Sequence, residues 1–171
     1  MSSTYHLRKR LVDIALEEVG VREVGTTNTG KRVVQYQAAT DLGGTGWPWC
    51  AAFVCWCIKE WLKDAEVRAA LKLTPSAAER WRPKTAAAFG FHEWAKSRGL
   101  LVMGDGASVV LHTADLVTYD FSHIGIVKDD MADMIFTIEG NTDGGGSRDG
   151  GGVWQKTRRR ELARRFIRLM P

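Results

Sequence analysis

The chain has 171 residues, of which 44% are hydrophobic and 26% are charged, as in an ordinary globular protein. These values exclude a disordered or collagen-like chain, and the length predicts one domain over residues 1–171. The net charge of +4 favours an anionic partner without identifying it.

Apolar residues at helical spacing predict several helices in the first hundred residues. The first covers residues 5–19, and a short second one covers 33–37. The segment 50–62 is apolar nearly all round, which predicts a buried central helix. Residues 63–83 have the charged, proline-broken composition of an excursion between helices. A last helix is expected over residues 84–98.

Beyond residue 100 the pattern changes to the alternation that is typical of strands. We expect five strands, at residues 108–111, 115–119, 123–127, 134–139 and 165–169. Helices followed by an antiparallel sheet define the α+β class, with the N-terminal helices packed on the sheet.

No segment predicts insertion into a membrane. The longest uncharged stretch, residues 42–58, contains several glycines and a proline and is shorter than the roughly 20 apolar residues that a membrane span needs. A basic N-terminal cluster could begin a signal peptide, but Asp13 and Glu17 interrupt the segment that follows. We therefore expect synthesis in the cytoplasm without a signal peptide.

Two glycine-rich segments resemble ligand-binding motifs only in part. Residues 25–31 fit the start of a phosphate-binding loop, but Arg32 stands where a Ser or Thr hydroxyl must hold magnesium. Residues 144–152 resemble one copy of a calcium-binding repeat that works only in stacked copies. We interpret the first as a polar turn and the second as a hairpin loop.

The three cysteines lie close together at Cys50, Cys55 and Cys57. Their odd number and the absence of a CxxC pair argue against a disulfide framework and a zinc site. Cys50 opens the buried helix, where unpaired backbone amides and the helix dipole favour a thiolate. Cys55 and Cys57 are interpreted as small core residues.

A thiol nucleophile needs a base, and the base needs an orienting partner. His123 stands at the head of an apolar strand and is the preferred base, with His112 as the weaker competitor. Glu139 and Asn141 are two residues apart, so an extended strand projects both from one face, where they could meet His123. Taken singly, each could be an ordinary solvated or turn residue.

Together these residues resemble the CHAP family, the cysteine, histidine-dependent amidohydrolases/peptidases. The resemblance spans nearly the whole chain, from residues 18–23 and Tyr36 to a closing Phe-Ile-Arg at 166–168. Its motifs are Trp49-Cys50-Ala51-Ala52-Phe53-Val54, Ala114-Asp115-Leu116-Val117, Ser122-His123-Ile124-Gly125-Ile126-Val127 and Ile138-Glu139-Gly140-Asn141-Thr142.

The resemblance implies a papain-like α+β fold in which Cys50 is the nucleophile, His123 the base, and Glu139 and Asn141 orient the imidazole. It implies cleavage of an amide in peptidoglycan, by an N-acetylmuramoyl-L-alanine amidase or a stem or cross-bridge endopeptidase. No cofactor or metal is implied, because the Asp-x-Asp calcium loop of some relatives is absent before Cys50.

A monomeric phage endolysin or wall-targeting effector acting at the bacterial cell wall fits this pattern. The oxyanion would meet the backbone amide of Cys50 and an upstream donor. Tyr36 and Gln37 are candidates for that donor by position, and Trp49 is a further substrate-binding candidate.

A non-catalytic module that binds the cell wall or a nucleic acid is the alternative. It would use the seven tryptophans as stacking platforms and the basic residues between 156 and 165 as a phosphate-contacting patch. This alternative does not account for the order of Cys50, His123 and Glu139, so we expect no nucleic-acid partner.

Overall fold

The computed structural model describes residues 4–104, 109–147 and 149–170. The helices are α1 (Tyr5–Glu17), α2 (Lys31–Gln37), α3 (Cys50–Trp61), α4 (Ala65–Ala70), α5 (Pro75–Trp81) and α6 (Gly90–Ser97). The strands are β1 (Leu101–Met103), β2 (Leu116–Tyr119), β3 (His123–Met131), β4 (Met134–Thr142), β5 (Gly152–Arg159) and β6 (Ala163–Arg168), with a 3-10 turn at Arg160–Leu162.

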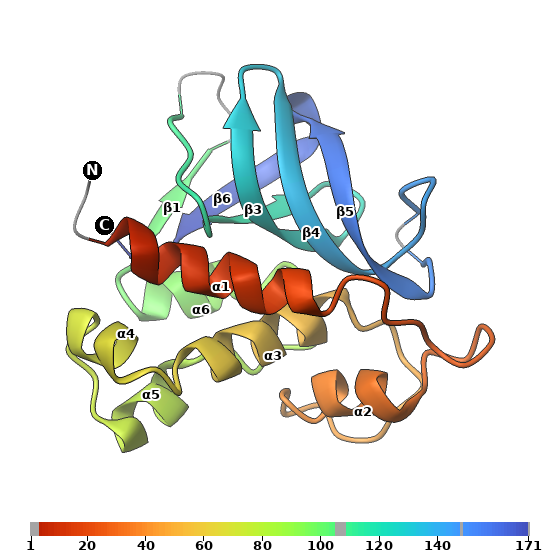
Figure 1. The fold of residues 1–171 in the computed structure, drawn as a ribbon, viewed down its shortest axis with the longest axis horizontal. Helices are drawn as coiled ribbons and strands as arrows, with labels where there is room; N and C mark the ends of the chain where they lie inside the picture. The colour runs from red at the N-terminus through yellow and green to blue at the C-terminus, as the bar shows by residue number, and fades with distance from the viewer. Residues whose placement is uncertain (1–3, 105–108, 148, 171) are drawn as a thin grey trace.

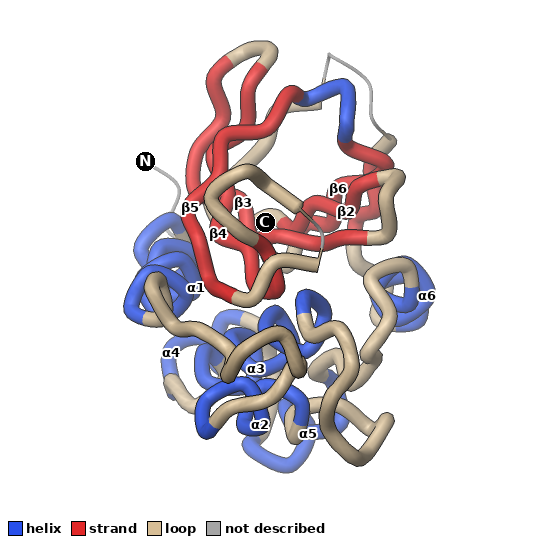
Figure 2. The backbone as a smooth tube through the Cα atoms, turned by 90° about the vertical axis from the view of Figure 1, so that its right-hand side faces the viewer, coloured by secondary structure: helices blue, strands red, loops and turns tan. Residues whose placement is uncertain are grey.

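The strands form one six-stranded antiparallel sheet in the order β1-β6-β2-β3-β4-β5. Helices α1 to α5 lie together below the sheet, and α6 lies beside it (Figures 1 and 2). The predicted α+β class, with N-terminal helices on an antiparallel sheet, is confirmed. The papain-like assignment within that class stays a prediction.

Helix α3 is the centre of the core, as its apolar composition predicts. Nine of its residues are buried, and it packs against α1, α2, β3 and β4. Its first turn approaches β4 at Gly140, where an added Cβ would lie 2.7 Å from Cβ of Phe53 and 3.0 Å from the Trp49 ring. A side chain at position 140 would therefore push the start of α3 away from the sheet.

The expected elements differ from the structure in several places. The excursion over residues 63–83 contains two short helices, α4 and α5, each begun by a side-chain cap from Asp64 or Thr74. The prediction of a strand at 108–111 is wrong for the described residues of that range, 109–111. The edge strand is instead β1, at Leu101–Met103. The last helix begins six residues later than predicted, at Gly90.

Strand β5 was not predicted, because its residues are mostly polar. It is an edge strand that pairs with β4 on one side, so few of its side chains need to be apolar. The glycine-rich segment before it connects two antiparallel neighbours, as a hairpin loop does. Among the described residues, no helix has the length and apolar character needed to cross a membrane.

Candidate active site

Cys50 is the first residue of α3, as the sequence predicts, and it carries a free thiol. It is 7% exposed, whereas Cys55 and Cys57 are fully buried. Burial raises the pKa of both deeper thiols above the ordinary value, which keeps them protonated and unreactive. Of the three cysteines, only Cys50 keeps some exposed surface and lies next to a titratable base.

That base is His123, the first residue of β3. Its ring is buried, and Nε2 lies 3.0 Å from Oε2 of Glu139. Because an ionised carboxylate only accepts hydrogen bonds, the neutral ring holds its proton on Nε2 and leaves Nδ1 as an acceptor. Nδ1 has no hydrogen-bond partner of ordinary geometry within the described part of the chain.

The electrostatics of His123 link it to Cys50. Burial lowers the pKa of the ring, but the neighbouring Cys50 side chain and the Glu139 carboxylate outweigh this effect and raise the pKa to about 9. The protonated imidazolium is therefore stable over the neutral pH range. An imidazolium beside a thiol is the arrangement that stabilises a thiolate nucleophile.

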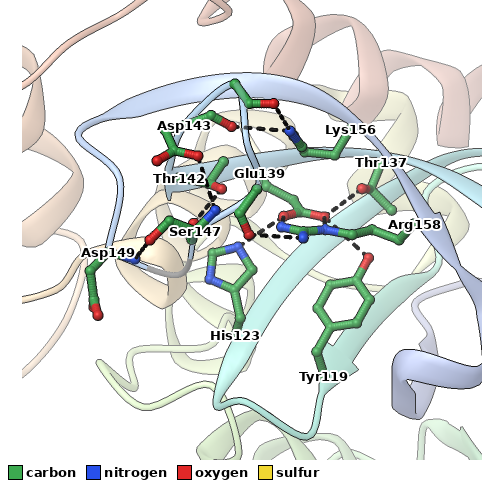
Figure 3. A network of polar contacts seen from close by, with 12 residues as sticks. Tyr119, His123, Thr137, Glu139, Thr142, Asp143, Ser147, Asp149, Lys156 and Arg158 are labelled. Carbon is green, nitrogen blue, oxygen red and sulfur yellow. Dashed lines mark hydrogen bonds and ion pairs between the residues drawn. The ribbon is translucent and has the colours of Figure 1, made fainter.

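Glu139 lies at the centre of a fully bonded polar network (Figure 3). Its Oε1 accepts hydrogen bonds from Thr137 Oγ1 at 2.6 Å and Tyr119 OH at 3.1 Å. Arg158 bonds both oxygens, with Nη2 at 2.6 Å from Oε2 and Nε at 3.1 Å from Oε1. Burial would raise the pKa of Glu139, but His123 and Arg158 lower it to about 2, so the carboxylate stays charged.

A glycine makes room for this carboxylate beneath the histidine. Gly125 lies two residues after His123 on β3, and an added Cβ there would meet Cγ of Glu139 at 2.8 Å. The Glu139 side chain thus crosses the β3 backbone at Gly125 to reach the imidazole. The Gly in the Ser-His-Ile-Gly motif has a direct steric role in the site.

Asn141 lies on the Cys50 side of the site. Its Oδ1 accepts a hydrogen bond from the backbone N–H of Trp49 at 3.2 Å, immediately before Cys50. The residue has a positive φ of 58°, a conformation that Asn tolerates better than most residues. Glu139 therefore contacts the imidazole directly, whereas Asn141 ties β4 to the turn that carries Cys50.

The three candidates for oxyanion or substrate contacts are placed differently from the expectation. Tyr36 and Trp49 are fully buried and stack on each other at 5.5 Å, and the Tyr36 hydroxyl donates to Glu18. The Gln37 amide donates both its protons, to the carbonyls of Asn28 and Trp47. None of these side chains is available to a substrate, because all three are buried. The expectation rested on their position in the sequence, which does not reveal burial.

The other histidines lie in different surroundings. His112, the competitor for the role of base, borders a groove formed by residues such as Leu100, Arg168 and Met170. His92 bonds Thr118 at 2.8 Å, and burial lowers the pKa of both His92 and His112. Of these three histidines, His123 is the one whose pKa is raised by the neighbouring Cys50 side chain.

The sequence analysis does not predict the roles of three residues that bond Glu139, namely Tyr119, Thr137 and Arg158. The sequence analysis puts Tyr119 and Thr137 on strands without a role, and it counts Arg158 among the basic residues of the alternative phosphate-contacting patch. Arg158 is in fact buried at 9% exposure. Lys156 and Arg158 are two residues apart, so a strand places both on one face, but this spacing does not indicate that the face meets Glu139.

No protein-family model matches this chain, and no curated protein matches it significantly. Among solved structures, the crystal structure of Ly7917 is similar, with a TM-score of 0.49 and 16% sequence identity. The match covers 94% of this chain and 61% of that one, so the chain spans less than two thirds of that neighbour.

Proposed function

We propose that this protein is a thiol-dependent amidohydrolase that cleaves an amide bond in peptidoglycan, as a muramoyl-L-alanine amidase or a peptide endopeptidase. The observation that carries the proposal is the arrangement of Cys50, His123 and Glu139. A thiol at the start of a buried helix lies beside an imidazole whose far nitrogen is held by a charged carboxylate. This is the geometry of a nucleophile, a base and an orienting group.

The reaction follows from these positions. The Cys50 thiolate attacks the amide carbonyl, and the His123 imidazolium gives its proton to the departing amine. Water, activated by the neutral imidazole, then hydrolyses the thioester and regenerates the thiol. Glu139 keeps the imidazole in one tautomer and stabilises its charged form.

The oxyanion is expected at the N-terminus of α3. Trp49 N–H is already bonded to Asn141, but the backbone N–H of Cys50 has no partner among the described residues. It is also the amide nearest the attacking sulfur along the chain. We assign it as one oxyanion donor, aided by the positive end of the helix dipole.

Peptidoglycan as the substrate rests on the CHAP-like motifs around Cys50, His123 and Glu139. The same resemblance implies action at the bacterial cell wall, as a phage endolysin or wall-targeting effector.

The binding-module alternative is weakened by how the basic run is used. Arg158 bonds Glu139, Arg160 pairs with Asp130, and Arg164 pairs with Asp120. Lys156 donates to the backbone carbonyls of Asp143 and Gly144. The tryptophans are buried or partly buried. Arg158 and Arg160 are buried and bonded within the fold, whereas Arg159, Arg164 and Arg165 are exposed, so only part of the basic run is open to a phosphate.

Digestion of purified peptidoglycan tests the proposal. We expect the wild-type protein to release new amino groups without new reducing sugar ends, and mass spectrometry of the fragments to identify the amide that is cut. Fragments that carry new reducing ends would show glycosidase activity and contradict the proposal, as would the absence of any product.

The same digestion tests whether a metal ion is needed. Within the described parts of the chain, no group of three or more His, Cys, Asp or Glu side chains is arranged to hold one. We expect the rate to be unchanged by EDTA. A loss of activity that added calcium restores would show that a metal site was missed.

A further inference from the structure

Arg158 shares the catalytic carboxylate with His123. Oε2 of Glu139 accepts from His123 Nε2 at 3.0 Å and from Arg158 Nη2 at 2.6 Å, so both side chains bond the same oxygen (Figure 3). The second contact, from Arg158 Nε to Oε1 at 3.1 Å, makes the pair bidentate. A planar guanidinium fixes the plane of a carboxylate in this way, which a lysine cannot do.

The Arg158 side chain is itself held in place. Its Nη1 donates to the carbonyl of Gly146 at 2.9 Å, in the loop between β4 and β5. Gly146 has a φ of +88°, and a Cβ there would lie 2.7 Å from Nη1. The Arg158 guanidinium also packs against the aromatic rings of Tyr119 and Phe121, whose centroids each lie 5.5 Å from its central carbon. Arg158 is therefore a buried cation with a fixed geometry.

From these contacts we propose that Arg158 is a positioning residue that orients and charges Glu139 and thereby sets the pH range in which Cys50 and His123 work. The inference rests on the proposed thiol mechanism. Arg158 touches neither substrate nor sulfur in this role and acts through Glu139 alone.

The direction of the pH effect follows from the charges around the network. Glu139 faces His123 from β3, Tyr119 from β2 and Arg158 from β5, and His123 faces Cys50 from α3. Asp143 also acts on Arg158. Without Arg158, the His123 imidazolium would be the one cation among the described residues that pairs with the buried Glu139 carboxylate. Removing Arg158 should therefore raise the pKa of His123. Glu139 would also take up a proton more readily, which moves the acid limb upward.

The test is an NMR titration of the four histidines, labelled at Cε1, in wild type and Arg158→Gln. The surroundings of His123 raise its pKa to about 9, whereas the pKa values of His92 and His112 are lowered. We expect the His123 midpoint to rise by about one pH unit in the variant, the effect of removing one close charge. Both limbs of the kcat/KM profile should move upward, with a loss at neutral pH of roughly 10- to 100-fold, the range seen when a hydrogen-bond partner behind a metal-ligating histidine is removed.

Arg159→Gln is the matched control, because it makes the same charge change at an exposed neighbour paired with Glu161. It should leave the titration and the activity unchanged. Arg158→Lys keeps the charge, and we expect its His123 midpoint within roughly 0.5 unit of wild type but a reduced kcat, since one ammonium cannot bond both oxygens. This variant carries the test if Arg158→Gln does not fold.

An unshifted His123 midpoint and pH profile in a folded Arg158→Gln, or a wild-type kcat in Arg158→Lys, would overturn the inference. A uniform loss of activity at every pH would show a merely structural role and would overturn it as well. Because the NMR titration needs no substrate, it reads out Arg158 even if the wild-type protein fails to cut peptidoglycan. That failure would instead contradict the proposed function.

Discussion

We expect Cys50→Ala to abolish hydrolysis of purified peptidoglycan while leaving the fold intact. The substitution removes the sulfur that forms the thioester, and no other described thiol can replace it, since Cys55 and Cys57 are fully buried. Loss of a covalent nucleophile lowers the rate of comparable hydrolases by about 10⁶-fold. Turbidity of a peptidoglycan suspension measures the loss, and circular dichroism checks the fold.

Cys55→Ala and Cys57→Ala are the matched controls, because they make the same chemical change one or two helical turns deeper. Each leaves a gap in the core, so stability falls, but a folded variant should keep its activity. Activity of Cys50→Ala near the wild-type level would overturn the assignment of the nucleophile.

Glu139→Gln has the second largest expected effect, a rate reduction of roughly 10- to 10⁴-fold, the upper end matching loss of the carboxylate in a serine triad. The amide keeps the shape of the side chain but no longer stabilises the imidazolium. It also leaves Arg158 as a buried cation without its anion, at a cost of about 3–5 kcal/mol of folding stability. Rates should therefore be measured below the melting temperature of the variant.

Asn141→Ala separates positioning of the nucleophile from orientation of the base. It removes the 3.2 Å bond to the Trp49 backbone and leaves the contact between His123 and Glu139 in place. We expect a smaller loss of rate than for Glu139→Gln. If Asn141→Ala lost nearly all of the hydrolysis rate and Glu139→Gln kept most of it, the third catalytic residue would be Asn141.

The parts of the fold that the sequence predicts well are those in which burial dictates composition. Helix α3 is apolar on every side because it is enclosed by other elements, and β3 begins with an apolar run for the same reason. Strand β5 escapes prediction because an edge strand need not be apolar. The short helices α4 and α5 are hidden by the charged residues around them, although Asp64 and Thr74 are recognisable caps.

In the site, the residues that belong to compact motifs could be predicted, and those brought in from a distance could not. Cys50, His123 and Glu139 lie in local patterns that resemble a known family. Arg158 reaches Glu139 only because β5 pairs with β4, a register that no local pattern reveals. Burial of Tyr36 likewise depends on how α2 packs against α3, so its position near the nucleophile was mistaken for access to the substrate.

The central claim is that Cys50 is a thiolate nucleophile activated by His123, and the rate of its alkylation by iodoacetamide tests this most directly. Mass spectrometry of the Cys50 peptide follows the reaction at about pH 6, more than two units below the usual thiol pKa of about 8.5. We predict rapid modification of Cys50 in the wild type, a loss of at least about tenfold in His123→Ala, and no modification of Cys55 or Cys57 in the native protein. Modification of Cys50 only near pH 8.5, at the same rate with and without His123, would contradict the account.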